Sequence, residues 1–165
     1  RKLNIPNKKL IGKKAITYED LRWKRRDIKS VSLLANVLAK KAASLKNAYE
    51  AILVDNGKIT EATASNVWII KNKRLLTHPT NSEILRGITR EAIKKIIMKN
   101  KLILLEKKFT LKQLYNADEV FITSSASFVT PITKIDSKLI NKGKIGKITL
   151  QLALIYANLF INEIS

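Results

Sequence analysis

Four short stretches of this 165-residue chain contain side chains whose types and spacing could do chemistry. The first is DIKSVSLLANVLAKKA, residues 27–42, in which Lys29 stands between Ile28 and the first turn of a predicted helix. A lysine that is partly buried beside apolar walls loses its proton more easily, which makes Lys29 a candidate catalytic amine. The alternative is a structural lysine, with a packed stem and an ammonium group in water.

The second stretch is GKITEATASNVW, residues 57–68, and its candidate is Glu61. Glu61 follows a predicted hairpin turn and precedes a predicted strand. Its carboxylate could therefore point into a cleft instead of along the face of a sheet. The alternative is a solvated acid in a loop.

The other two stretches could bind an anion. In LRGITREA, residues 85–92, Gly87 is followed by two residues that open a predicted helix, and free N–H groups at a helix start favour phosphate. In FITSSAS, residues 121–127, a predicted strand ends in three successive hydroxyl side chains, Thr123, Ser124 and Ser125, which could bind the same phosphate from a second side. The alternatives are a plain helix start and an ordinary polar turn.

Taken together, the four stretches describe one ligand. An amine can form a Schiff base, a carboxylate can pair with a pyridinium nitrogen, and two groups of donors can bind a phosphate. These are the groups that a protein needs to bind pyridoxal phosphate. We therefore expect pyridoxal 5′-phosphate as the cofactor, and no metal site among the candidates.

The same stretches resemble a known family. EDLRWKRRDIKSVSLLANVLAKKAA, EAILVDNGKITEATASNVWIIKN, THPTNSEILRGITRE and EVFITSSAS are similar, in order and spacing, to the D-amino-acid (D-alanine) aminotransferases of the fold-type IV pyridoxal-phosphate family. The resemblance runs from about Ala15 to the end of the chain. It implies an aminotransferase that acts on amino acids and 2-oxo acids, with a homodimer as the usual assembly. Aminodeoxychorismate lyases and branched-chain aminotransferases of the same fold are the alternatives, followed by a non-enzymatic remnant or a basic binding module.

The resemblance also implies roles for individual residues. Lys29 would carry the Schiff base and move the substrate proton, Glu61 would face the pyridine nitrogen, and Leu85 would lie against the cofactor ring. The phosphate would be bound by four residues from the two anion-binding stretches: Ile88, Thr89, Ser124 and Ser125.

Four other positions match or depart from the family pattern without a catalytic role. Arg22 and Trp23 belong to a motif near the site, and His78 is expected to be structural. Ala64 stands where relatives often have a serine, so one local hydrogen bond is expected to be missing.

The elements that must position these residues follow from hydrophobic periodicity. Alternating or continuous apolar runs predict strands, and i, i+3, i+4 spacing predicts helices. We expect a helix from Ser30, with Leu34, Val37, Leu38 and Leu45 on its apolar face, a second helix after Gly87, and a third from Ile148 to Ile164. The predicted strands are 14–20, 49–55, 66–72, 73–78, 101–109, 118–125 and 128–136, with a short helix at 110–117. The fold class is therefore mixed α/β, and the resemblance implies a mostly antiparallel pseudo-barrel sheet with flanking helices.

The domain organisation follows from composition and from the resemblance together. Residues 1–14 are basic and irregular and are expected to connect this domain to a missing amino-terminal domain, while residues 15–165 form the cofactor-binding domain. Family members carry that other domain, with a phosphate-binding arginine and the groups that hold the substrate carboxylate. We therefore expect a truncated chain, which starts with Arg1, and little activity from it alone.

The charge and the cysteine content restrict the location and the partners. The formal net charge is +19 and the pI is about 10.2, but the lysines are scattered through every segment and no aromatic–basic motif accompanies them. We expect no specific nucleic-acid partner. Cysteine is absent and no apolar run approaches the roughly 20 residues that cross a bilayer, so a cytoplasmic protein without a membrane partner is expected.

Overall fold

The computed structural model describes residues 10–162. Its strands are β1 (Lys13–Glu19), β2 (Glu50–Asp55), β3 (Lys58–Ala62), β4 (Asn66–Lys71), β5 (Arg74–Thr77), β6 (Ile103–Glu106), β7 (Glu119–Ser124), β8 (Phe128–Ile135) and β9 (Lys138–Leu139). Its helices are α1 (Leu34–Leu45), α2 (Ile88–Lys99), α3 (Leu111–Tyr115) and α4 (Lys147–Asn162), and a 3₁₀ turn, η1, covers Asn141–Gly143.

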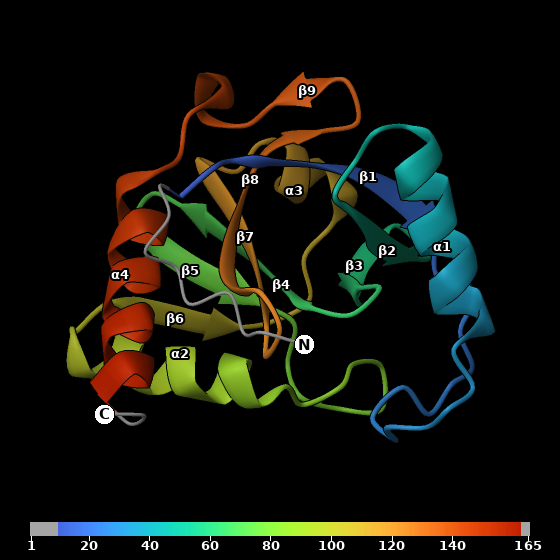
Figure 1. Ribbon diagram of the computed structural model, residues 1–165, viewed down its shortest axis with the longest axis horizontal. Coiled ribbons are helices and arrows are strands. Elements are labelled where there is room, and N and C mark those ends of the chain that lie inside the picture. The colour runs from blue at the N-terminus through green and yellow to red at the C-terminus, as the bar shows by residue number, and fades with distance from the viewer. Residues whose placement is uncertain (1–9, 163–165) are drawn as a thin grey trace.

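The strands form one strongly curled sheet (Figure 1). Their order is β3-β2-β1-β8-β7-β4-β5-β6, with β9 paired to β8. Among the described residues β1 pairs in parallel with β2 and β8, β5 pairs in parallel with β6, and the other ladders are antiparallel. The first strand in this order, β3, leads into β4 through a short turn. In this turn the N–H of Ala62 donates to the carbonyl of Ser65 at 2.7 Å. The predicted mixed α/β fold with a mostly antiparallel pseudo-barrel sheet is confirmed.

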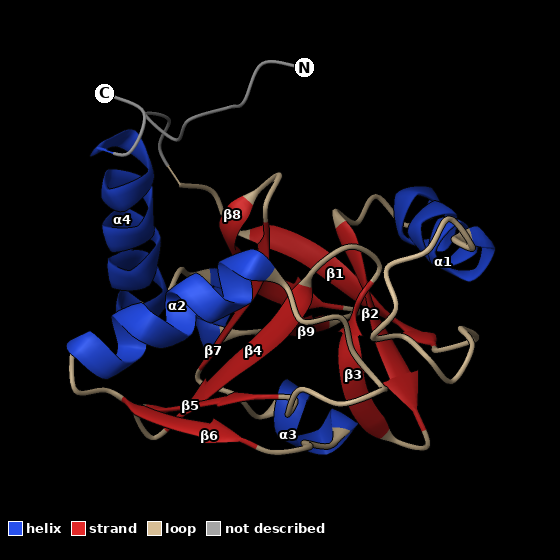
Figure 2. Ribbon diagram, turned by 90° about the horizontal axis from the view of Figure 1, so that it is seen from below, coloured by secondary structure: helices blue, strands red, loops and turns tan. Residues whose placement is uncertain are grey.

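The core is divided between the two faces of this sheet, because successive side chains of a strand point to opposite sides. Val67 and Ile69 of β4 pack inside the curl, and Trp68 and Ile70 pack outside it under α2 and α4. A third cluster joins α1 to β1 and β2 through Ala39 and Ala43. Figure 2 shows α2 and α4 together over one part of the sheet and α1 apart from them at the other end.

Helix α1 differs from its prediction in both its start and its buried face. It begins at Leu34 with Leu33 as N-cap, because the Ser30 hydroxyl instead accepts a hydrogen bond from the N–H of Ser32 in a turn. The four predicted face residues are exposed, and the helix packs on the sheet through two alanines four residues apart. Small side chains let the helix approach the sheet closely, and periodicity alone does not distinguish that face from the leucine face. The exposed residues are Leu34, Val37, Leu38 and Leu45.

The other differences come from burial that the sequence pattern does not reveal. The predicted buried strand 101–109 is the short edge strand β6, which pairs with one neighbour and leaves Ile103 exposed. In α2 the charged Arg90 is fully buried, whereas the apolar Ile88 at the start of the helix is exposed. Strand β3 was not predicted, because it is short and follows its hairpin turn directly.

Residues 1–9 of the predicted connector lie outside the described residues, and Lys13 and Lys14 already belong to β1.

In the described part of the chain, no helix combines the length and the apolar character that crossing a bilayer requires.

Candidate functional site

Glu61 is the fourth residue of β3, a strand that begins directly after a tight hairpin turn. Asn56 and Gly57 both have positive φ, 49° and 73°, as expected for an Asn-Gly pair in a two-residue hairpin loop. The turn reverses the chain from β2 into β3, and the curl of the sheet then covers Glu61, which is only 4% exposed. The alternative of a solvated loop acid is wrong.

Three hydrogen-bond donors surround the Glu61 carboxylate. Arg22 donates from Nη1 to Oε1 at 2.5 Å, and Asn66 donates from Nδ2 to Oε2 at 3.0 Å. The backbone N–H of Leu85 lies 3.2 Å from both carboxylate oxygens. These donors come from the loop after β1, from β4 and from the loop before α2, so Glu61 joins three separate parts of the chain.

The protonation of Glu61 reflects a balance between burial and these donors. Burial removes water from the carboxylate and raises its pKa to about 7, while the charge and hydrogen bond of Arg22 and the N–H of Leu85 act against that rise. Near neutral pH the group is therefore poised between its two forms. A further positive charge nearby, such as a pyridinium, would favour the ionised form.

Asn66 aligns the loop that leads to α2. Its Nδ2 also donates to the carbonyl of Leu85 at 2.8 Å, and its Oδ1 lies where a side chain on Gly87 would be, 2.4 Å from the position of a Cβ. A glycine is therefore required for this close approach. Asn66 is also paired across the sheet with Thr123, directly before the predicted phosphate-binding serines.

The start of α2 fits an anion-binding role. Gly87 is the N-cap in an extended conformation, and no side chain caps the first turn. Thr89 is buried, with its hydroxyl 3.4 Å from that of Tyr156 on α4, whereas Ile88 is 76% exposed.

The second predicted phosphate-binding stretch is the turn between β7 and β8. The hydroxyl of Ser124 lies 2.7 Å from that of Ser127 and accepts the Ser127 N–H, and Ser125 is exposed at the tip of the turn. Phe128, which is paired with Ser124, contacts the ring of Tyr156. Thr89, in one predicted phosphate-binding stretch, and Phe128, directly after the other, therefore both contact Tyr156.

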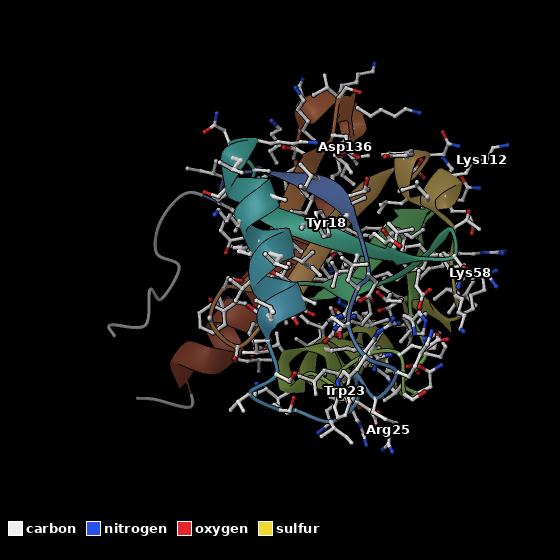
Figure 3. The ribbon with its side chains drawn as sticks, turned by 90° about the vertical axis from the view of Figure 1, so that its right-hand side faces the viewer. Tyr18, Trp23, Arg25, Lys58, Lys112 and Asp136 are labelled. Atoms are coloured by element: carbon white, nitrogen blue, oxygen red, sulfur yellow. The ribbon has the colours of Figure 1, made fainter. Side chains whose placement is uncertain are left out.

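Lys29 lies in the loop between β1 and α1 and is exposed, as are its neighbours Ile28 and Val31, so the expected partial burial beside apolar walls is wrong. Figure 3 shows this loop, with Trp23 and Arg25 labelled, at the end of the molecule opposite Asp136. Two hydrogen bonds, one from the loop and one from α1, hold the chain on the two sides of Lys29. The N–H of Arg26 donates to the carbonyl of Ser82 at 2.8 Å, and Asn36 Nδ2 donates to the carbonyl of Thr63 at 2.7 Å. These bonds tie the segment that contains Lys29 to the turn after β3 and to the loop before α2.

Two residues of this arrangement had no predicted role. Arg22 belonged to a recognised motif, and the signal that could have indicated its function is its neighbour Asp20, a carboxylate that can orient a guanidinium. Asn66 gave no such signal, because an asparagine at the start of a strand is common in turns.

The curled sheet and this set of residues define a class of protein. Residues 5–135 match the sequence profile of the family Amino-transferase class IV, and the chain belongs to that family.

Among individual proteins, the chain is similar to D-alanine aminotransferases. It is 50% identical over 153 residues to that of Listeria innocua, which covers 93% of this chain and 52% of the relative. It is 48% identical over 141 residues to that of Staphylococcus aureus strain N315, which covers 86% of this chain and 50% of the relative. The chain therefore spans about half the length of the curated relatives it matches.

Solved structures of branched-chain aminotransferases have the same fold. The Escherichia coli enzyme aligns with a TM-score of 0.80 and 28% identity, covering 90% of this chain and 52% of that one. The Thermobaculum terrenum enzyme, solved in its PLP form, aligns with a TM-score of 0.82 and 27% identity, covering 90% of this chain and 51% of that one.

Proposed function

We propose that this chain is the cofactor-binding half of a pyridoxal-phosphate-dependent aminotransferase that acts on D-alanine. The observation that carries the proposal is the buried Glu61 carboxylate, held by hydrogen bonds to the loop that opens α2. The match to D-alanine aminotransferases at about half sequence identity supports the substrate.

The residues present fit the cofactor. The uncapped first turn of α2, with Ile88 and Thr89, offers N–H groups and a hydroxyl for a phosphate, and Ser124 and Ser125 add donors from the turn after β7. Leu85, between Glu61 and α2, would lie against the ring. Its N–H bond to Glu61 fixes the distance between the carboxylate and the phosphate-binding turn.

The bound cofactor would supply an electron sink for negative charge at the substrate's α-carbon. Lys29 would hold the cofactor covalently through Nζ and, once released, would move the α-proton. Glu61 in its ionised form would keep a proton on the pyridine nitrogen, because a carboxylate beside a pyridinium favours both charges. The groups that bind the substrate carboxylate would lie in the half of the protein that this chain does not cover.

A branched-chain aminotransferase is the second candidate, because the solved structures with this fold include several such enzymes. Their sequence identities to this chain, 28% and 27%, are well below the 50% of the D-alanine aminotransferase relative.

The test is a transaminase assay on this chain and on a fusion of it to the amino-terminal half of the Listeria innocua relative. With saturating pyridoxal phosphate and 2-oxoglutarate, we expect the fusion to convert D-alanine to pyruvate and the chain alone to show little activity. Positioning of reactants accounts for ~7–11 kcal/mol of a barrier, and the chain alone would lack the groups that hold the substrate carboxylate. A fusion that prefers L-leucine would favour the second candidate, and a Lys29→Ala fusion with full activity would refute the proposal.

A further inference from the structure

A buried ionic cluster at the end of β1 supports Glu61. Arg22 donates from Nε to Oδ1 of Asp20 and from Nη2 to Oδ2, both at 2.8 Å, and from Nη1 to Glu61 at 2.5 Å. The side chains of Asp20, Arg22 and Glu61 are 0%, 9% and 6% exposed. One guanidinium therefore bridges two carboxylates away from water.

The geometry of Arg22 leaves its guanidinium little freedom. The two parallel bonds to Asp20 fix the plane of the group, as fork-to-fork pairs do. Asp20 is itself held by the hydroxyl of Thr60 at 2.6 Å and by Arg26, whose Nε lies 3.4 Å from Oδ2. The remaining nitrogen, Nη1, is thus aimed at Glu61.

The charged groups that face Glu61 are Arg22 and Asp20, both from the loop after β1. The other elements in contact with the carboxylate contribute neutral groups, the amide of Asn66 from β4 and the N–H of Leu85 from the loop before α2. Arg22 and the Leu85 N–H oppose the effect of burial on the pKa of Glu61, and Asp20 adds to it. Arg22 is the cation of this set, so its removal would leave Glu61 neutral at pH 7.

We propose that Arg22 is a positioning residue that favours the ionised form of Glu61 and directs its carboxylate at the cofactor's pyridine nitrogen. The proposal rests on the proposed function for the identity of the cofactor, but the contact between the two side chains does not. Asp20 orients Arg22, and Arg22 acts through Glu61 without touching the cofactor.

The first test uses the cofactor-free chain and carbon NMR of the glutamate carboxyls, with Glu61 assigned by Glu61→Gln. In the unchanged protein, the guanidinium signals of Arg22 should shift at the pH where Glu61 titrates, while those of Arg26 should not. The titration is followed in the unchanged protein, and Glu61→Gln serves only to assign the Glu61 signal. Arg22 signals that do not follow Glu61 would overturn the proposal.

The variants Arg22→Gln and Arg26→Gln form a matched pair, because both remove a buried arginine that contacts Asp20 and only one contacts Glu61. We expect Arg22→Gln to raise the pKa of Glu61 by about one to three pH units and Arg26→Gln to leave it in place. Equal shifts in both variants would show that the effect is general loosening, and would contradict the proposal.

The second test measures affinity for pyridoxal phosphate and for its 1-deaza analogue, in which a C–H replaces the ring nitrogen. Arg22→Gln should weaken binding of pyridoxal phosphate about tenfold and leave binding of the analogue unchanged. Equal weakening for both ligands would overturn the proposed action on the nitrogen. If neither ligand binds the unchanged chain, the proposed function fails, and the NMR result still decides whether Arg22 controls Glu61.

Discussion

At the scale of single residues, burial of the Glu61 side chain destabilises its charged form and so lowers the stability of the fold at neutral pH. Glu61 is buried, and its pKa of about 7 lies above the ordinary value of 4.5 because burial disfavours the carboxylate. Asp20 shows the opposite balance. Burial acts to raise its pKa as well, but hydrogen bonds from Arg22 and Thr60 and the charges of Arg22 and Arg26 hold that pKa below its usual range.

This difference predicts the pH dependence of folding. Between pH 4.5 and 7, folded Glu61 retains a proton that the unfolded chain has released, so the free energy of unfolding should fall as the pH rises. Relative to Glu61→Gln, the free energy of unfolding of the unchanged protein should fall by about 3 kcal/mol as the pH rises from 4.5 to 7. Below pH 4.5 the difference between the two proteins should stay constant. Urea denaturation of both proteins at several pH values measures this. If the free energies of unfolding of the two proteins change in parallel from pH 4 to pH 8, the raised pKa of buried Glu61 is contradicted.

At the scale of elements, the start of α2 is anchored by a buried arginine. Arg90 donates from Nη2 to the carbonyl of His78 at 2.8 Å and to Glu106 at 2.6 Å, and its guanidinium lies over the ring of Trp68. The backbone carbonyl of His78, a residue expected to be structural, thus ties the loop before α2 to the first turn of this helix. This anchor joins α2 to β6 and to the end of β5.

Arg90→Ala should therefore destabilise the fold by about 3 kcal/mol, because it removes a buried side chain and leaves a carbonyl without its donor. Arg86→Ala is the matched control. Arg86 and Arg90 both pair with Glu91, but the side chain of Arg86 is 69% exposed. Its removal should therefore change the free energy of unfolding by less than about 0.5 kcal/mol. Thermal or urea denaturation compares the two, and similar losses in both variants would show that the Arg90 cluster has no special role.

Most of the helices and strands could be predicted from the sequence. The strands around Trp68 and Phe121 and the helix after Gly87 follow from local periodicity, and the structure confirms them. The burial of Arg90 and the inward alanine face of α1 could not be predicted, because they depend on which chain segments pack together. The same limit applies to the site. Glu61 was a candidate from its position after a turn, but its contact with Arg22 joins residues 39 positions apart.

At the scale of the whole molecule, the excess of positive charge needs an explanation that fits the fold. The chain has 32 lysines and arginines against 13 acidic residues. Several of the arginines, including Arg22, Arg26 and Arg90, are paired with carboxylates in or near the site. The exposed lysines and arginines are distributed over many helices, strands and loops and do not form one continuous motif.

We therefore expect binding to duplex DNA to be weak, independent of sequence and strongly dependent on salt, as for simple phosphate neutralisation. Fluorescence anisotropy with labelled duplexes at about 50 mM and 200 mM salt tests this, and affinity should fall steeply between the two. Tight binding to one sequence that persists at physiological salt would show that nucleic acid is a specific partner.

The most direct test of the central claim is covalent labelling of Lys29. The chain is incubated with pyridoxal phosphate, reduced with borohydride and digested, and the labelled peptides are identified by mass spectrometry. We predict a pyridoxyl group on Lys29, at low cofactor concentration, because hydrogen bonds on both sides of Lys29 tie its segment to Thr63, two residues after Glu61, and to Ser82 in the loop before α2. Glu61→Gln should weaken this labelling, while labelling of other lysines stays the same. A label spread over many lysines and unchanged in Lys29→Ala would contradict the assignment of this chain as a pyridoxal-phosphate-binding domain.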